Sequence, residues 1–151
     1  MEREKEKDTD KKAMHSILFD RNIFIIWKPE YNLGIPIIDE QHRGIVTIIN
    51  SLYFGMQHDC IKKIFRPIIA MMENYTNIHF QTEETFLEKV NFPTAAEHHK
   101  LHRELSSKLT SIGVTSIMKN DPYEFMEFLK KWWIHHICNE DLIYRNYLQE
   151  T

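Results

Sequence analysis

Seven residues of metal-binding type form an ordered pattern along this chain. They fall in four separate segments: His42; His79 and Glu83; His98 and His102; and His136 and Asp141. Imidazole and carboxylate ligands together favour iron, manganese or zinc over calcium or magnesium. Because seven ligands are enough for two ions, the pattern predicts a metal centre that the fold assembles from four separate places.

The spacing of the ligands within a segment indicates helices. In the second and third segments the two ligands are four residues apart, which places both side chains on one face of a helix. His136 and Asp141 are five residues apart, so a regular helix would turn them about 140° away from each other. A π-type turn between Ile137 and Asp141 would return the aspartate to the centre, and such turns often occur at functional sites. If this stretch is regular, Glu140 should be the ligand instead.

The apolar residues after position 38 recur with the period of an α-helix in four segments. The expected helices span residues 39–58, 61–88, 93–113 and 122 onward. Short connections favour antiparallel neighbours, so we predict an all-α fold, an up-down-up-down antiparallel four-helix bundle with an extended N-terminal arm. In such a bundle the four ligand segments lie at the same end, because they fall alternately at helix starts and helix ends.

Individual residues set the expected helix ends. Asp39 and Asp121 are suitable N-caps for the first and fourth helices. Pro93 fits the first turn of the third helix, and Gly113 should end that helix. Pro67 lies near the beginning of the second helix, where it either starts the helix or bends it.

The length of 151 residues predicts one compact domain. Two shorter segments are expected before it. Residues 1–14 should form a mobile charged tail, because they contain too little apolar surface to become ordered. Residues 15–38 should form an arm packed on the bundle of residues 39–151, since two prolines and a glycine interrupt any helix there. The aromatic residues expected to attach the arm are Phe24, Trp27 and Tyr31.

Composition excludes several classes of function. The net charge of −3 and the interspersed positive charges argue against a nucleic-acid partner. No run of about 18 apolar residues could span a membrane, and the charged start differs from a secretory signal, so a cytoplasmic protein is expected. Cys60 and Cys138 are far apart and are expected to be free thiols. We expect a monomer.

Other metal architectures fit the sequence less well. A ferritin-like di-iron site would need Glu-x-x-His pairs on two helices, and the chain has no such pair. An HExxH zinc motif is also absent, and a single zinc ion would leave several ligands without a role. The remaining histidines are expected to be ordinary core or surface residues: His15, His58, His99 and His135.

Four stretches of the sequence resemble a known family. They are GIPIIDEQH, HFQTEETFLEKVNFP, EHHKLH and FLKKWWIHHICNED. Together they are similar to a hemerythrin-like domain, close to the bacterial single-domain hemerythrins (bacteriohemerythrins). The resemblance covers nearly everything after Trp27, and all seven ligand positions of the family are present in order. It also favours Asp141 over Glu140 as the last ligand.

The resemblance implies a non-haem centre of two iron ions (Fe²⁺/Fe³⁺) joined by an oxo or hydroxo bridge. Glu83 and Asp141 would be the bridging carboxylates. The histidines implied for the first iron are His98, His102 and His136, and those for the second iron are His42 and His79. One coordination position on the second iron would remain for dioxygen, which would bind end-on as a hydroperoxide.

Reversible dioxygen binding needs a pocket without proton donors. The expected lining consists of residues one turn from, or beside, the ligands: Ile45, Phe80, Trp132 and Trp133. Relatives usually have leucine at the position of Trp133, so a larger ring would narrow this pocket.

We expect an oxygen carrier or store and no enzyme, with an unknown oxygen-using enzyme or redox protein as partner. The alternatives are an oxygen or redox sensor, or a protein that handles nitric oxide or peroxide or repairs iron centres.

Overall fold

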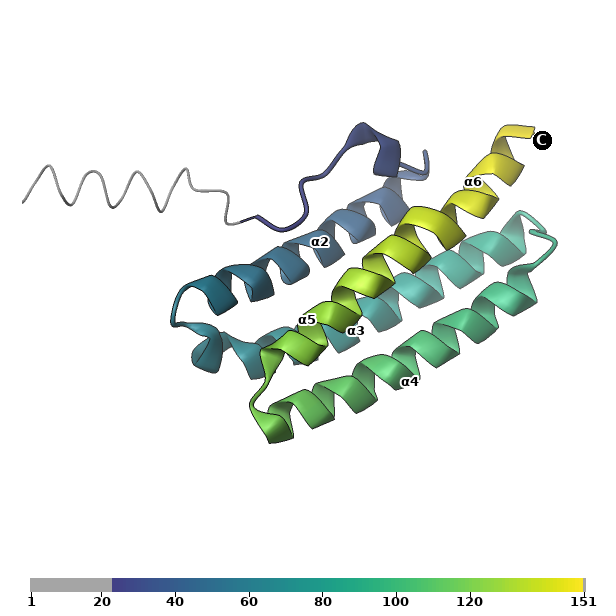
Figure 1. The fold of residues 1–151 in the computed structure, drawn as a ribbon. Coiled ribbons are helices and arrows are strands. Elements are labelled where there is room, and N and C mark those ends of the chain that lie inside the picture. Colours follow the sequence, from purple (N-terminus) through teal and green to yellow (C-terminus); the bar gives the residue numbers. More distant parts are fainter. Residues whose placement is uncertain (1–22, 151) are drawn as a thin grey trace, which may run out of the picture.

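The computed structural model describes residues 23–150, which form a bundle of four long helical rods. A short 3-10 helix, η1 (Pro29–Tyr31), precedes them. The first three rods are α2 (Pro36–Gln57), α3 (Ile61–Lys89) and α4 (Ala95–Lys119). The fourth is a succession of three elements: α5 (Pro122–Trp132), the π-helical η2 (Trp133–Glu140) and α6 (Asp141–Glu150). The predicted all-α, up-down-up-down bundle is confirmed (Figure 1).

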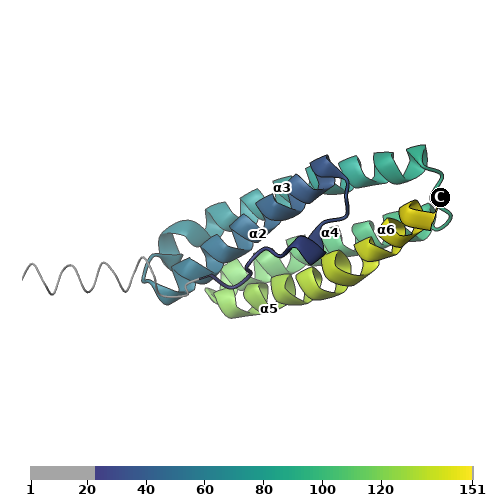
Figure 2. The ribbon, with the colours of Figure 1, turned by 90° about the horizontal axis from the view of Figure 1, so that it is seen from above.

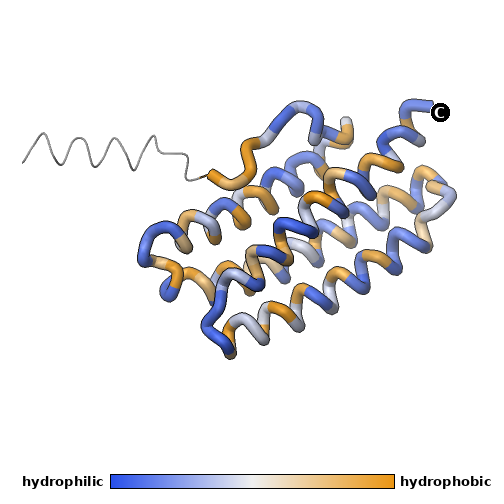
Figure 3. The backbone as a smooth tube through the Cα atoms, viewed as in Figure 1, coloured by the Kyte–Doolittle hydropathy of each residue, from blue (hydrophilic) through white to orange (hydrophobic). Residues whose placement is uncertain are grey.

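The rods close into a ring of neighbours. α2 packs against α3, α3 against α4, α4 against α5, and α5 returns to α2. Hydrophobic and hydrophilic residues alternate along every rod with the helical period (Figure 3), so each helix can turn one apolar side to its neighbours. Within residues 23–150 no helix is both long and apolar enough to cross a membrane.

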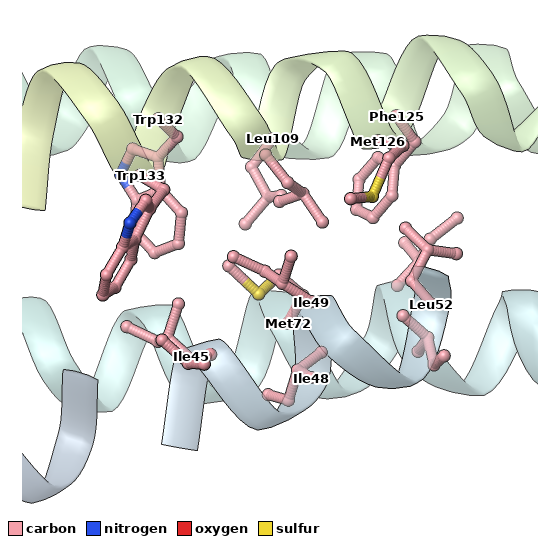
Figure 4. Close-up of a cluster of buried hydrophobic side chains, with 14 of the residues drawn as sticks. Ile45, Ile48, Ile49, Leu52, Met72, Leu109, Phe125, Met126, Trp132 and Trp133 are labelled. Carbon is pink, nitrogen blue, oxygen red and sulfur yellow. The ribbon is translucent and has the colours of Figure 1, made fainter. Parts of the chain in front are cut away.

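The buried apolar residues form two separate clusters along the bundle. The larger cluster fills the middle and the end nearest the α2–α3 connection, and Figure 4 shows part of it around Ile49, Met72 and Leu109. The smaller cluster lies near the opposite end and includes Ile38 and Leu87. Along each of the first two rods the predicted ligands fall between residues of these two clusters, so an apolar layer closes the centre on both sides.

The segment before α2 lies along the bundle between α2 and the last rod (Figures 1 and 2). Asn50 of α2 holds it, because the Asn50 Oδ1 atom accepts hydrogen bonds from the backbone N–H groups of Phe24 (3.0 Å) and Ile25 (2.8 Å). The Asn50 Nδ2 atom donates to the carbonyl of Ile25 (2.8 Å). Trp27 and Tyr31 pack against the large core cluster. The predicted tail, residues 1–14, lies outside the described residues, as does the beginning of the predicted arm.

The predicted N-cap of the first rod was wrong. The helix begins at Pro36, three residues earlier than expected, with Ile35 as N-cap. Asp39 lies in the first turn instead, and its carboxylate accepts hydrogen bonds from the backbone N–H groups of Leu33 (2.6 Å) and Gly34 (3.1 Å). Gly34 has φ +84°, a conformation that suits glycine, so the aspartate stabilises the tight turn leading into the helix.

The expected ends of the third rod were also wrong, whereas Asp121 is confirmed as an N-cap that accepts from the backbone of Tyr123 (2.9 Å). Pro93 precedes the third rod, which starts at Ala95. Gly113 lies inside the helix, where an added Cβ would come within 3.0 Å of the Ile69 side chain, so glycine here permits close helix packing. The rod ends only at Asn120, a left-handed C-cap residue. Pro67 lies inside α3, which begins at Ile61.

Replacing Asp39 with alanine should lower the free energy of unfolding by about 1–3 kcal/mol, because the backbone N–H groups of buried Leu33 and of Gly34 would lose their acceptor. Glu40→Ala is the matched control, since Glu40 is exposed and forms its ion pair with Arg43 of its own helix (3.4 Å). Chemical denaturation followed by circular dichroism measures both changes. Equal losses in the two variants would show that the Asp39 hydrogen bonds do not stabilise the turn.

Candidate metal centre

The structure brings all seven predicted ligand residues together in the interior of the bundle. Each of their side chains is at most 6% exposed. They form two groups that share Asp141, and the potential ligand atoms within each group lie within 4.8 Å of one another. The larger group is Glu83, His98, His102, His136 and Asp141, and the smaller group is His42, His79 and Asp141. This division matches the one that the resemblance implied for the histidines of two ions.

The two carboxylates lie between the two groups of histidines. The Asp141 Oδ2 atom is 3.2 Å from Nε2 of His42, while its Oδ1 atom is 3.4 Å from Nε2 of His98. Glu83 has the same double contact, with Oε2 3.5 Å from Nε2 of His79 and Oε1 3.4 Å from Nε2 of His98. Asp141 could therefore contribute one oxygen to each of two ions. Glu83 belongs to the larger group only, because its Oε2 atom also lies 3.2 Å from Nε2 of His102.

A π-helix places the last carboxylate. The backbone from Trp133 to Glu140 is π-helical, which confirms the turn expected from the five-residue spacing of His136 and Asp141. As a result, the Asp141 Oδ1 atom lies 3.4 Å from Nε2 of His136. Glu140, the alternative that a regular helix would have favoured, is exposed and belongs to neither group of candidate ligands.

Polar residues next to the ligands orient two of the imidazole rings. The Oε1 atom of Glu84 is 2.9 Å from Nδ1 of His102, and Oε1 of Gln41 is 3.2 Å from Nδ1 of His79. Gln41 is itself fixed, because its Nε2 atom donates to Oγ1 of Thr82 (3.0 Å). With Nδ1 engaged in this way, Nε2 of each ring is free to face the centre. Sequence reasoning did not single out Glu84 or Gln41, although each directly neighbours a ligand in the chain.

Many atoms that face the centre have no hydrogen-bond partner in the protein. They are both carboxylate oxygens of Glu83, both of Asp141, and the Nε2 atoms of His98, His102 and His136. A buried polar atom without a partner is unfavourable by about 1–3 kcal/mol. Metal ions would satisfy all these atoms at once, so the donor set fits a metal-binding role.

Burial and neighbouring charges shift the pKa values of the ligands in opposite directions. Burial lowers the pKa of His79 to about 3 and that of His136 to about 4. Burial also acts to lower the pKa of His98, but the adjacent carboxylates of Asp141 and Glu83 raise it to about 10. Burial would raise the pKa of both carboxyls, yet the surrounding imidazoles hold both below their usual range. The carboxylates and these two low-pKa histidines are thus already in the forms that bind metal, and His98 would release a proton on binding.

The expected pocket residues are all buried, but they differ in their contacts. The Phe80 ring stacks on His102 with centroids 3.8 Å apart, and the Trp132 ring lies parallel to that of His136 at 6.2 Å. Ile45 is fully buried, and Trp133 extends toward it in Figure 4. On its other side Trp133 contacts the segment before α2, with its ring 5.3 Å from Tyr31 and 6.1 Å from Trp27.

Tyr144 is a buried residue of the centre that sequence reasoning missed. Its side chain is 0% exposed, its hydroxyl has no hydrogen-bond partner, and its ring centroid is 5.9 Å from that of His98. Burial, followed by the charges of Asp141 and Glu83, raises the pKa of Tyr144, which keeps the hydroxyl protonated. Its position one turn after Asp141 was the signal that could have identified it.

The other histidines stay out of the centre, as expected. His58, His99 and His135 belong to neither ligand group. His135 is exposed, and His99 lies 3.9 Å from the carboxylate of Glu88. His15 is outside the described residues.

Comparison with known proteins gives a consistent result. The sequence-family model of the hemerythrin HHE cation binding domain matches residues 33–148, a range that contains all seven candidate ligands. A bacteriohemerythrin of Clostridium acetobutylicum is 30% identical over 126 residues, which are 79% of this chain and 97% of the relative. One of Pseudomonas aeruginosa is 29% identical over 124 residues, or 80% of this chain and 78% of the relative. A hemerythrin-like protein of Naegleria fowleri is 24% identical over 122 residues, with coverage of 81% and 92%.

Removing the partner of a ligand should weaken metal binding. Glu84→Ala should lower the affinity for divalent metal by about 10–100-fold, because His102 would lose the contact that orients its ring. Glu88→Ala is the matched control, since Glu88 lies on the same helix near a histidine that is not a ligand. Competitive titration against a chelator measures both affinities. An unchanged affinity in Glu84→Ala would mean that packing alone orients His102.

Proposed function

This chain belongs to the hemerythrin family of cation-binding domains, and from that premise we propose that it binds dioxygen reversibly at a centre of two iron ions. The observation that carries the proposal is the pair of ligand groups joined by Asp141 in an interior closed by apolar residues. When bound, two ferrous ions would supply the two electrons that dioxygen accepts. The proposed role is that of an oxygen carrier or store.

The unequal ligand groups support binding at one ion only. Five residues converge on the larger group, whereas His42 and His79 converge with Asp141 in the smaller one. An ion held by the smaller group would have fewer protein ligands and therefore more room for an external molecule. We propose that His42 and His79 hold the ion that receives dioxygen.

The residues around the centre suit a reversible reaction. Ile45, Phe80, Trp132 and Trp133 are between 0% and 5% exposed, so they exclude water. None of these four side chains releases a proton near neutral pH, which limits protonation of reduced oxygen and its loss as peroxide. The hydroxyl of Tyr144 releases no proton either, because its raised pKa keeps it protonated. In this proposal the chain binds, orients and shields, and it carries out no further reaction.

The proposal is tested by the fate of the reduced, iron-loaded protein after mixing with dioxygen. We expect two irons per chain by metal analysis, and a rapid spectral change that reverses when inert gas removes the dioxygen. Recovery of the ferrous state supports a carrier. One-way oxidation would contradict it and favour a sensor, or a protein acting on peroxide or nitric oxide, at the same ligands.

Trp133→Leu should change the rate of dioxygen association or of autoxidation. The indole fills space beside Ile45 and supports Trp27 and Tyr31, so a smaller side chain would widen the pocket and loosen its cover. Stopped-flow mixing measures association, and slow absorbance changes in air measure autoxidation. Trp133→Phe, which keeps an aromatic ring, serves as the control. If both rates are unchanged in the leucine variant, Trp133 has no part in dioxygen access.

A further inference from the structure

The ligand residues are enclosed, so a metal ion must pass through the protein surface to reach them. Among the seven, six are at most 2% exposed and His98 is the most accessible at 6%. A cavity at His136 and another at His98 each have a candidate ligand in their lining. These cavities differ in charge, and the difference indicates which of them a cation would use.

The cavity at His136 is poorly suited to a cation. It has a volume of about 280 Å³ and lies along α4 and the fourth rod, where Leu105, Phe128 and Trp132 form apolar walls. Lys108 and Lys131 also line it, and both are exposed. His135 and Glu140 line it as well, so two lysines stand against a single carboxylate, and the positive balance repels a divalent cation.

The cavity at His98 has the opposite character. It has a volume of about 90 Å³ and lies between the beginning of α4 and the junction of η2 and α6. Glu97 and Glu140 line it and are exposed, and no lysine or arginine is part of its lining. Neither glutamate forms an ion pair with another residue of the range 23–150. Glu97 also lies in the first turn of α4, where its charge offsets the positive end of the helix.

His98 connects this cavity to the centre. Its ring lines the cavity, yet its Nε2 atom is buried and has no hydrogen-bond partner. That atom lies 3.4 Å from Oε1 of Glu83 and 3.4 Å from Oδ1 of Asp141. Among the seven candidate ligands, His98 is therefore the one that both lines this cavity and lies against the buried carboxylates.

We propose that Glu97 and Glu140 form an entry site at which ferrous iron is captured before it passes His98 into the centre. The inference rests on the proposed iron centre and adds the route by which that centre is loaded. Two carboxylates attract the hydrated divalent cation and raise its local concentration at the opening. The interior then binds the ion more tightly, because it offers imidazole nitrogens, which suit iron better than the carboxylate oxygens at the opening.

The test measures metal uptake by the metal-free protein, with Co²⁺ as a probe whose visible absorption reports binding to imidazole. The double variant Glu97→Gln/Glu140→Gln should take up Co²⁺ about tenfold more slowly at low ionic strength, with the difference shrinking as salt is added. Glu73→Gln/Glu127→Gln is the control, since it makes the same change in net charge at glutamates that line neither cavity. Uptake by the first variant at the wild-type rate, or equal slowing in the control, would overturn the proposal.

A second measurement separates an entry site from a ligand of the final centre. An entry site speeds release as well as uptake, so the double variant should also lose Co²⁺ to a chelator about tenfold more slowly, with unchanged affinity and stoichiometry. A loss of affinity without slower release would show that the glutamates support the centre itself. If the wild-type protein binds no metal, the proposed function fails; if it binds two ions but the variant is indistinguishable from it, only the entry route fails.

The competing route through the other cavity gives its own signal. Lys108→Gln/Lys131→Gln should change the rate of Co²⁺ uptake by less than about twofold if the cation enters at Glu97 and Glu140. An acceleration of about tenfold would instead place the entrance at His136 and contradict the proposal.

Discussion

The burial of two carboxylates and five imidazoles in one apolar interior is the constraint on which the rest of this structure depends. Charged and polar groups removed from water need partners, and here the inward-facing atoms of Glu83 and Asp141 have no hydrogen-bond partner in the protein. The two apolar clusters on either side close the site to water, while Gln41 and Glu84 fix the rings of His79 and His102 from outside. The bundle thus provides rigid placement, and the groups it leaves unpaired are the ones that metal ions would satisfy.

The fourth rod shows how a local irregularity serves this constraint. A regular helix would direct Asp141 away from His136, and the π-helical segment from Trp133 to Glu140 removes that mismatch. The same segment contributes Trp133 to the aromatic contacts with Trp27 and Tyr31. It also contributes Glu140 to the lining of both cavities that reach a ligand. One widened stretch of helix therefore connects ligand placement, the cover of the centre and access to it.

Some features were predictable because they depend only on residues close in sequence. Helical periodicity is local, so four rods and the face carrying the candidate ligands could be expected. The five-residue spacing of His136 and Asp141 made a π-helix one of two alternatives, and the family resemblance favoured it. The helix ends were less predictable. Asp39 could have been an N-cap, but its acceptors are used by Leu33 and Gly34, and Gly113 could have ended a helix, but it lies where α4 approaches Ile69. For Gly113 a contact with another helix outweighs the local preference, whereas for Asp39 the turn just before the helix uses the carboxylate instead.

The sequence by itself therefore determined the types and order of the candidate ligands and the helices that carry them, because side-chain chemistry and helical period depend on neighbouring residues. The tertiary structure alone decided which atoms meet. It placed Asp141 between both groups of histidines, put the ring of Tyr144 edge-on to that of His98, and brought the ring of Trp133 against that of Tyr31. It also left Glu97 and Glu140 on one cavity although 43 positions separate them in the chain. Such proximity depends on how the rods are rotated and packed against one another, and no local pattern specifies that rotation.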